Sequence, residues 1–304
     1  MGNIQYLQQQ QVDKIKWDQC IGNAANGLVY AYSFYLDAMA KHWDALVLGD
    51  YEAVMPLTWN KKYGVQYLYQ PPFAAALGVF GKQVTAALLG DFLNAIPDKF
   101  KYWDINFNHG NFFQLADFNL YERMNFVLSL NESYNNISSG YRDNIKRNVK
   151  KSEQRKDSVQ KNIDISEVIG LAKKQLQHLT KLGDDDFERF KNLYGVLYEK
   201  QMATTYGIYT ASRQLVASAA FFFSHNRGYY ILVGNHPNGK TSGASHALID
   251  EFIKDQAGQN LLLDFEGSDI RNLAFFYRSF GASEEKYPAI KLNRLPFYLK
   301  WMKK

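Results

Sequence analysis

The sequence contains a single cysteine, Cys20, among its 304 residues. A disulfide within the chain and a metal cage built from several thiolates are therefore excluded. The six histidines show no spacing typical of metal ligands, so we expect no metal site. Cys20 has no partnered histidine nearby in the sequence, and we interpret it as a small buried residue.

Long apolar runs are also missing. No stretch of the sequence approaches the roughly 20 apolar residues that a membrane-spanning helix needs. The first five residues have neither the basic head nor the apolar run of a secretory signal. We therefore expect a soluble, cytoplasmic protein without a membrane span.

The excess of positive charge is small, whereas aromatic residues are abundant. Lysine and arginine number 35 against 30 acidic residues, and this net charge of +5 does not by itself indicate a nucleic-acid partner. The chain contains 21 Phe and 21 Tyr, which is enough for a large core. Its length allows two domains of ordinary size.

The second half of the chain repeats the element order of the first at an offset of about 160 residues. In each half we expect three strands linked by turns, then a helix and a last strand. The first copy is predicted at 45–48, 52–59, 65–70, 83–95 and 102–108, and the second at 207–210, 215–224, 229–234, 242–257 and 261–265. We interpret this order as a duplicated α/β unit; the alternative is chance repetition of a common strand–turn–strand pattern.

A glycine-containing loop, residues 238–245, opens the helix of the second copy. Gly243 falls in the first helical turn, where the missing side chain lets an anion approach backbone N–H groups. Lys240 adds a positive charge. The loop is therefore a candidate phosphate site, and an ordinary turn with a helix cap is the alternative. His236 and His246 flank the loop, and we expect both to be polar surface groups.

Two ionisable residues follow this loop. The apolar strand at 261–265 leads into Glu266, which is a candidate general base because ligands of open α/β sheets lie outside the carboxyl ends of strands. A helix at 271–279 carries Tyr277, whose phenol can protonate a leaving thiolate. The alternatives are a solvated loop carboxylate for Glu266 and a core tyrosine for Tyr277.

The segment between the two copies, residues 138–156, is basic. If it is helical, Arg142, Lys146 and Lys150 share one line of the surface by their four-residue spacing. Arg147, Lys151 and Arg155 share a second line. This surface could contact RNA phosphates, and a solvated helix face is the alternative.

Two of these motifs resemble those of GNAT acyltransferases. The run Lys240-x-x-Gly243-x-Ser245 is similar to a degenerate form of their acyl-CoA pyrophosphate loop. The run Asn272-x-Ala274-x-x-Tyr277-x-x-x-Gly281 is similar to their final helix, although the spacings from the Asn and the Ala to the Tyr are shorter here.

Further motifs resemble the Fem-type branch, whose members carry two GNAT-like domains in one chain. They are Arg142-x-Asn144-Ile145-x-x-Asn148-x-x-Lys151, Leu263-Asp264-Phe265-Glu266-Gly267 and Phe280-Gly281-Ala282. The resemblance covers nearly the whole chain. It implies an α/β (α+β) protein with tandem GNAT-like domains at 1–128 and 129–304, each a mixed, mostly antiparallel sheet flanked by helices.

The resemblance also implies a reaction and a site. Acetyl-CoA or another acyl-CoA would give its acyl group to a small-molecule or peptide amine bound in the cleft between the domains. Tyr277 would be the catalytic acid and Glu266 the base. The donor would bind at Leu232, Val233, Gly234, Lys240, Thr241, Ser242, Gly243, Ala244, Ser245 and Asn272.

The first domain is expected to be degenerate, because Pro71 and Pro72 stand where its phosphate loop would be and proline has no backbone N–H. Two other functions stay open. One is the Fem-type transfer of an amino acid from aminoacyl-tRNA to a cell-wall peptide, although the chain lacks the long coiled-coil insertion of Fem proteins that read aminoacyl-tRNA. The other is a binding protein that kept the fold and lost turnover.

Overall fold

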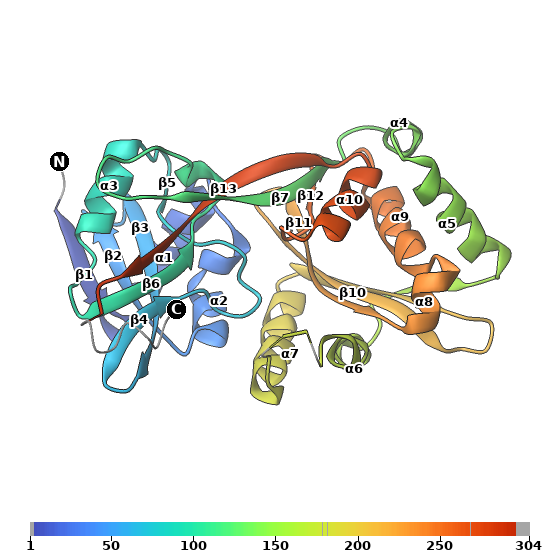
Figure 1. The fold of residues 1–304 in the computed structure, drawn as a ribbon, viewed down its shortest axis with the longest axis horizontal. Coiled ribbons are helices and arrows are strands. Elements are labelled where there is room, and N and C mark those ends of the chain that lie inside the picture. Colours follow the sequence, from blue (N-terminus) through green and yellow to red (C-terminus); the bar gives the residue numbers. More distant parts are fainter. Residues whose placement is uncertain (1–2, 178, 181, 268, 296–304) are drawn as a thin grey trace. The chain divides into compact units, whose positions relative to one another are not determined.

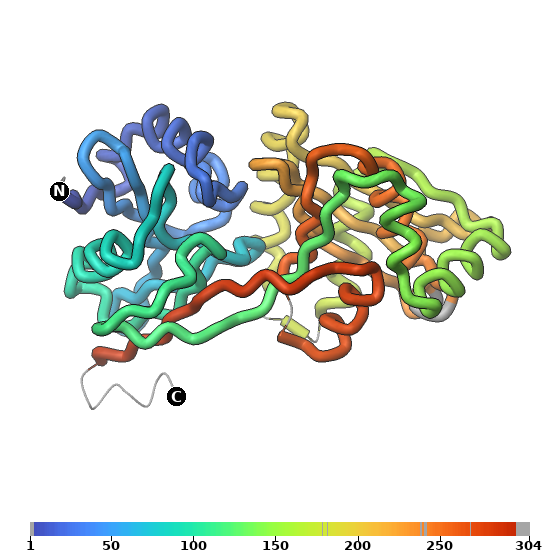
Figure 2. The backbone as a smooth tube through the Cα atoms, turned by 90° about the horizontal axis from the view of Figure 1, so that it is seen from above, coloured from blue at the N-terminus to red at the C-terminus, as the bar shows by residue number. Residues whose placement is uncertain are grey.

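The computed structural model describes residues 3–177, 179–180, 182–267 and 269–295, without the side chains of residues 238, 240 and 241. The chain folds into two compact units. Unit 1 comprises the chain up to Arg123 and again from Lys286, and unit 2 comprises Met124–Glu285. The chain enters unit 2 within β7 (Tyr121–Ser129) and leaves it within β13 (Ser283–Asn293) (Figure 2).

Unit 1 is built on a mostly antiparallel sheet of order β1-β2-β3-β4-β6-β13, with β5 paired to β3. Its remaining strands are β1 (Ile4–Gln8), β2 (His42–Leu48), β3 (Ala53–Lys62), β4 (Val65–Tyr69), β5 (Phe80–Gly81) and β6 (Phe100–Asn106). Its helices are α1 (Lys14–Asn23), α2 (Ser33–Met39) and α3 (Ala86–Asn94), with short 3-10 turns at Gln9–Gln11, Val29–Ala31 and His109–Asn111.

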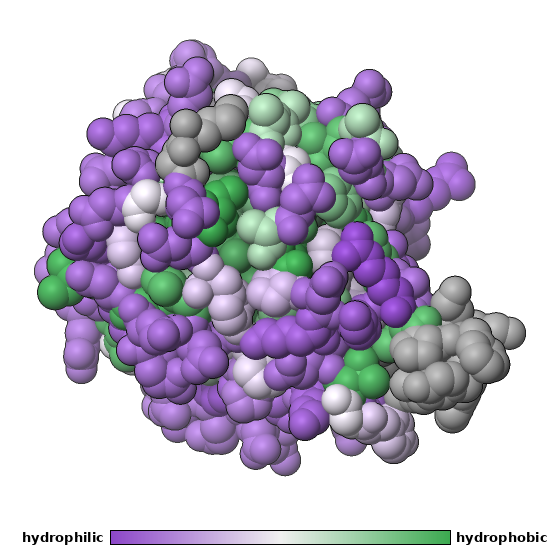
Figure 3. All heavy atoms as spheres, turned by 90° about the vertical axis from the view of Figure 1, so that its left-hand side faces the viewer, coloured by the Kyte–Doolittle hydropathy of each residue, from purple (hydrophilic) through white to green (hydrophobic). Residues whose placement is uncertain are grey.

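The helices of unit 1 cover its sheet through large apolar side chains. Leu89, Phe92 and Leu93 of α3 pack on a core formed by β2, β3, β4 and β6. Trp17 of α1 contacts Trp43 of β2 with ring centroids 5.2 Å apart. The side of unit 1 shown in Figure 3 is covered mainly by hydrophilic side chains, with apolar residues visible between them.

Unit 2 is built on a sheet of order β7-β12-β11-β10-β9-β8. Its strands after β7 are β8 (Ser158–Lys161), β9 (Ala203–Tyr209), β10 (Leu215–Ser224), β11 (Arg227–Asn235) and β12 (Leu262–Asp264). Its helices are α4 (Tyr134–Ser139), α5 (Asp143–Gln154), α6 (Ile165–Leu176), α7 (Asp184–Glu199), α8 (Pro237–Ser242), α9 (Ala244–Gln256) and α10 (Arg271–Ser279).

The two sides of the unit 2 sheet carry different helices. One core joins α5, α9 and α10 to strands β9 to β12, and includes Ile145, Phe252 and Tyr277. Helices α6 and α7 lie on the other side (Figure 1), where Phe190 of α7 stacks on Phe222 of β10. Of the helices that the described residues form, none combines the length and the apolar composition needed to cross a bilayer.

Both units contain the same supersecondary sequence. In unit 1, β2, β3 and β4 form an antiparallel meander, and after α3 strand β6 pairs parallel to β4. In unit 2, β9, β10 and β11 form the meander, and after α9 strand β12 pairs parallel to β11. The predicted fold class, a tandem α/β architecture with mostly antiparallel sheets, is therefore confirmed.

The end of the chain belongs to a different unit than the sequence suggested. We expected a second domain at 129–304, but the segment from Lys286 belongs to unit 1, where β13 pairs with β6. Strand β7, which follows the first copy, pairs instead with β12 of unit 2. Strand exchange of this kind depends on long-range ladder pairing, so local sequence patterns carry little trace of it.

Candidate functional site

Two neighbouring strands of unit 2, β11 and β12, diverge soon after they begin. Their parallel pairing covers only three residues of β11, Arg227, Gly228 and Tyr229. Residues 230–235 of β11 continue along β10 without a strand partner on their other edge in the described part of unit 2. The Asn235 N–H on this edge donates to the Gln175 side chain at 2.6 Å, and the backbone groups before it can meet a ligand.

A bulge sets which backbone groups reach the open edge. Ala220 of β10 pairs with Leu232 and Phe221 pairs with Tyr230, so Ile231 is the extra residue. The N–H of His236 donates to Val216 of β10 at 2.9 Å. Because donors alternate in an antiparallel ladder, the N–H and C=O of Val233 point away from β10, toward the open edge.

The predicted strand residues around Val233 are all part of β11. Leu232 and Gly234 are buried and Val233 is half-buried against the core that includes α9. A side chain on Gly234 would meet the backbone of α6, since its Cβ would lie 2.7 Å from the Ala172 nitrogen. Glycine is therefore required here for the packing of α6 against β11.

In the described part of unit 1, the backbone edge of the corresponding strand is paired. Strand β4 pairs with β6 from Gln66 to Tyr69, which is nearly its whole length. Beyond it, the Gln70 side chain accepts from the Asn106 N–H at 3.0 Å and donates to the Ala74 carbonyl at 2.6 Å. Strand pairing and this side chain close the edge that β11 leaves open in unit 2.

The segment 238–245, predicted as a loop, is largely helical, and this prediction was wrong. Helix α8 ends at Ser242, Gly243 adopts a left-handed conformation with φ of 87°, and α9 begins at Ala244. A Cβ on Gly239 would lie 2.2 Å from the Val216 carbonyl oxygen. The small residues allow α8 to pack on the backbone of β10, a tertiary contact that local turn propensities do not reveal.

Several residues predicted to contact the phosphates are instead in contact with other parts of the protein. A Cβ on Gly243 would lie 2.2 Å from the Asn148 carbonyl oxygen of α5. Ser242 is buried and donates to the Gly239 carbonyl, and Ser245 donates to the Asn235 side chain at 2.5 Å. The first N–H groups of α9, at Ala244 and Ser245, have no acceptor within the helix. The predicted side-chain contacts of Lys240 and Thr241 lie outside the described residues.

A buried ionic network anchors the end of β12. Arg227 of β11 donates to Asp264 of β12 at 2.8 Å and to Glu285 of β13 at 2.9 and 2.5 Å. Asn125 of β7 donates to Asp264 at 2.9 Å. The arginine and both carboxylates are largely shielded from solvent. The sequence analysis did not identify Arg227, although an arginine at the start of an apolar strand indicates a charge that needs a buried partner.

This network also fixes the turn that carries Glu266. The Glu266 N–H donates to Asp264 at 2.9 Å, and the Gly267 N–H donates to Asn125 at 2.6 Å. Glu266 has a φ of 66°, which is strained for a residue with a side chain. The hydrogen bonds of these two N–H groups hold this backbone conformation and so fix the position of the Glu266 Cα, from which its side chain extends.

Tyr277 lies next to this turn. Its ring stacks on Phe265 with centroids 4.5 Å apart, and only 7% of the residue is exposed. Burial, and then the negative charge of Glu266, raises the pKa of the Tyr277 phenol above its ordinary value. The structure therefore places Tyr277 within reach of the charge of Glu266, and the phenol is protonated at neutral pH. Asn272 lies on the exposed side of α10.

His246 differs from its predicted role as a surface group. It extends from α9 toward α10, where its ring meets Phe276 edge-on at 5.0 Å. Its Nδ1 atom is buried and has no hydrogen-bond partner among the described residues. Burial lowers the pKa of His246 to about 4, so the ring is neutral at pH 7. The described side chains include no group of three His, Cys, Asp or Glu residues placed to hold a metal ion.

Comparisons with known proteins bear on the fold. No protein-family profile and no curated protein sequence matches this chain. Among solved structures, FemX matches with a TM-score of 0.65 at 11% identity, covering 98% of this chain and 99% of its own. L-PGS from Bacillus licheniformis matches with a TM-score of 0.58 at 11% identity, covering 95% and 93%.

A tandem GNAT protein from the clavulanic acid biosynthesis pathway matches with a TM-score of 0.55 at 8% identity, covering 97% of this chain and 99% of its own. At such low identities these likenesses establish the fold alone. They agree with the repeated meander, helix and strand of the two units. The chain therefore has the Fem-like, tandem GNAT fold that these three structures share.

Proposed function

We propose that this chain transfers an acyl group from acetyl-CoA or another acyl-CoA to an amine of a small molecule or peptide. The observation that carries the proposal is the divergence of β11 and β12, which opens a strand edge in unit 2, whereas the corresponding strands β4 and β6 of unit 1 stay paired. The donor lies along this edge, where the Val233 N–H donates to it. Its pyrophosphate meets the first N–H groups of α9.

The chemistry follows from the residues at the carboxyl end of β12. The amine nitrogen attacks the thioester carbonyl carbon, a C–N bond forms and the C–S bond breaks. Glu266 accepts the proton that the amine loses, and Tyr277 donates a proton to the leaving thiolate. The raised pKa of Tyr277 keeps the phenol protonated at neutral pH but also makes it a weaker acid, so it donates its proton only as negative charge develops on the sulfur.

Replacement of Tyr277 by Phe tests the acid. We expect kcat for acyl transfer to fall about 100-fold, the lower range for loss of a positioned general acid. Tyr141→Phe is the matched control, because it also removes the hydroxyl of a buried unit 2 tyrosine, one that lies outside the proposed site. Full activity of Tyr277→Phe with a panel of amines would remove Tyr277 from the mechanism.

Native mass spectrometry with a panel of acyl-CoAs tests the donor separately. A specific adduct with one CoA per chain is expected. An adduct without turnover on any amine would favour a binding protein that kept the fold. The absence of any adduct would contradict the donor assignment itself.

A second donor, aminoacyl-tRNA, is favoured by the surface of α5. The side chains of Lys146, Arg147, Lys150 and Lys151 are exposed along this helix. Helix α5 packs against the candidate site, because the Asn148 carbonyl oxygen occupies the space where a side chain on Gly243 would lie. A cationic helix beside the start of α9 suits a donor that carries a phosphodiester backbone.

A salt titration of tRNA binding tests this second donor. If α5 contacts about four phosphates, the plot of log K against log salt should have a slope of about −3. Arg147→Glu should weaken binding and flatten this slope, whereas Lys174→Glu, on the exposed side of α6, should leave both unchanged. No binding at low salt would exclude aminoacyl-tRNA as the donor.

A further inference from the structure

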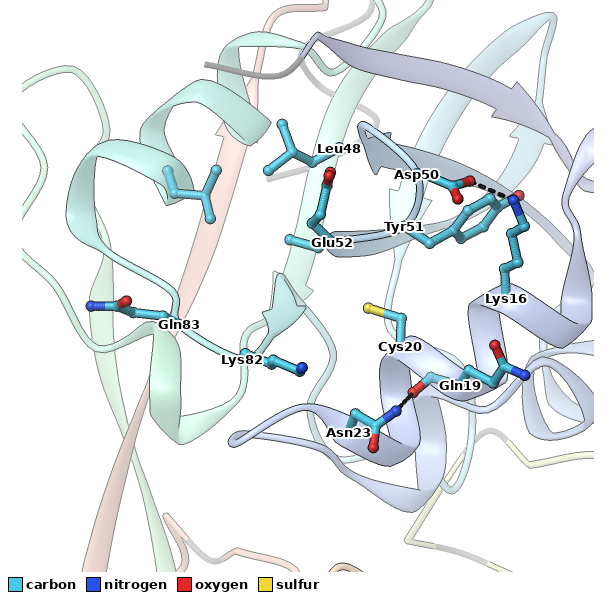
Figure 4. A pocket seen from close by; sticks show the side chains of 12 residues that line it. Lys16, Gln19, Cys20, Asn23, Leu48, Asp50, Tyr51, Glu52, Lys82 and Gln83 are labelled. Carbon is cyan, nitrogen blue, oxygen red and sulfur yellow. Dashed lines mark hydrogen bonds and ion pairs between the residues drawn. The ribbon is translucent and has the colours of Figure 1, made fainter.

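Unit 1 contains a cavity of about 530 Å³ that the proposed acyl transfer does not use. It is lined by α1, the turn between β2 and β3, the segment after β5, and α3 (Figure 4). Its volume falls within the roughly 300–1,000 Å³ typical of small-ligand sites. All of its lining residues lie between Lys16 and Leu88, so none belongs to the donor site of unit 2.

The cavity carries charges of both signs. Lys16 and Asp50 neutralise each other through an ion pair of 2.6 Å at one end. Glu52 and Lys82 also line the cavity, and neither forms an ion pair with any residue that the structure describes. Their side chains come from different segments, the β2–β3 turn and the stretch after β5 (Figure 4). One carboxylate and one ammonium are therefore available to a ligand.

The turn that carries Glu52 is tightly constrained. Gly49 has a φ of 55°, and a Cβ there would lie 1.9 Å from a carboxylate oxygen of Glu52. Tyr51 has a φ of 66°, and its hydroxyl accepts from the Asp13 N–H at 2.8 Å. The Glu52 N–H donates to the Leu48 carbonyl at 3.1 Å. The backbone that carries Glu52 is therefore fixed before a ligand arrives, which lowers the entropic cost of binding.

Between Glu52 and Lys82 the cavity lining is apolar and includes the thiol of Cys20. Leu48, Ala53 and Leu88 contribute aliphatic surface, and the side chains of Cys20 and Lys82 point toward each other across the hollow (Figure 4). Cys20, which we interpreted as a small buried residue, is half-buried at this wall. Burial, and then the charge of Glu52, raises the pKa of its thiol to about 11, which leaves the thiol neutral at pH 7.

We propose that this cavity binds a short zwitterionic peptide, with the peptide ammonium at Glu52 and the peptide carboxylate at Lys82. A simple anion would be repelled by Glu52 and a simple cation by Lys82, whereas a ligand with both charges satisfies both residues. The apolar lining contacts the peptide side chains. The volume suits a ligand of drug size, which favours two or three residues over a free amino acid.

The only cysteine of the chain provides a direct reporter for this site. The full chain is treated with N-ethylmaleimide at pH 7, where a peptide amine with a pKa of about 8 is still charged. Alkylation of Cys20 is followed by intact mass with and without L-alanyl-L-leucine. At a peptide concentration of ten times Kd, the rate should fall about tenfold, because only the free protein reacts. Calorimetric titration with the same dipeptide measures Kd independently.

Matched ligands and variants test each charge. N-acetylation of the dipeptide removes its ammonium and C-terminal amidation removes its carboxylate, and each should weaken binding about two- to fivefold, as expected for exposed ion pairs. Glu52→Gln should abolish the preference for the free ammonium, and Lys82→Met the preference for the free carboxylate. Because Glu52→Gln also lowers the Cys20 pKa, protection is compared as a ratio within each variant.

Three results would overturn the proposal. They are no calorimetric binding of the dipeptide at millimolar concentration, equal binding of the free, acetylated and amidated dipeptides, and unchanged charge preferences in both variants. Thermal unfolding of the variants controls for loss of structure, and both replaced side chains are exposed. None of these results depends on acyl transfer, so failure here and failure of the proposed enzyme function are distinguishable.

Discussion

Replacement of Arg227 by Met should lower the free energy of unfolding by about 3–5 kcal/mol, the usual cost of removing one partner from a buried ion pair. The guanidinium neutralises Asp264 and Glu285, and its side chain is only 9% exposed. Without it, both carboxylates lose their charged partner in a site that water reaches poorly. Chemical denaturation followed by circular dichroism measures the change.

A second Arg–Glu pair of unit 2 provides the control. Arg278 and Glu284 also form an ion pair, but their side chains are 47% and 39% exposed. Replacing Arg278 by Gln should cost at most about 1 kcal/mol, because water solvates the remaining carboxylate. Equal losses for the two arginines would show that burial of the Arg227 network does not govern its contribution.

Replacement of Gly243 by Ala is expected to be the other severe change, with a loss of about 2–5 kcal/mol in unfolding free energy. Part of the loss comes from placing a Cβ at a φ of 87°. The larger part comes from contact with α5, because the new Cβ would lie 2.2 Å from the Asn148 carbonyl oxygen. The junction between α8 and α9 must shift to relieve this overlap, so binding of a donor there should weaken as well.

Gly258→Ala separates the two contributions to this loss. Gly258 has a φ of 82°, close to that of Gly243, but a Cβ there would meet no atom within 4 Å. Its replacement should cost only about 1–2 kcal/mol, the backbone part alone. If the two variants lose the same stability, the close approach of α5 to Gly243 is not energetically important.

These two expectations alter how the junction between α8 and α9 can be tested as a donor site. From the sequence, a bulky residue at Gly243 should block an anion and leave the fold intact. In the structure the space beside its Cα is occupied by α5, so the variant changes packing before any ligand binds. Loss of CoA binding in such a variant is therefore interpretable only beside a measured stability.

Strong local patterns predicted the elements of this chain well. The expected strand at 215–224 and the expected helix at 271–279 coincide with β10 and α10. Both have a continuous signal, an apolar run between turns for the strand and a helical spacing before Gly281 for the helix. The order of meander, helix and strand in both halves also holds, because each step is set by turns and periodicity within about ten residues.

Contacts distant in sequence account for what the sequence analysis missed. The end of the chain pairs with β6, α8 packs on β10, and Arg227 joins carboxylates from two other strands. None of these contacts leaves a periodic pattern, because each depends on where another segment lies in space. The same applies to the cavity of unit 1, whose charged residues come from three separated segments.

By itself the sequence determined the class of fold, the repeated order of elements and two candidate residues, Glu266 and Tyr277, which lie close enough for the charge of one to raise the pKa of the other. It could do so because hydrophobic period, turns and helix spacing are local properties. Only the tertiary structure decided which unit has an open strand edge. That difference rests on the pairing between the last strand of the meander and the strand that follows the helix. Strand β4 keeps this pairing with β6 over nearly its whole length, whereas β11 loses it with β12 after three residues.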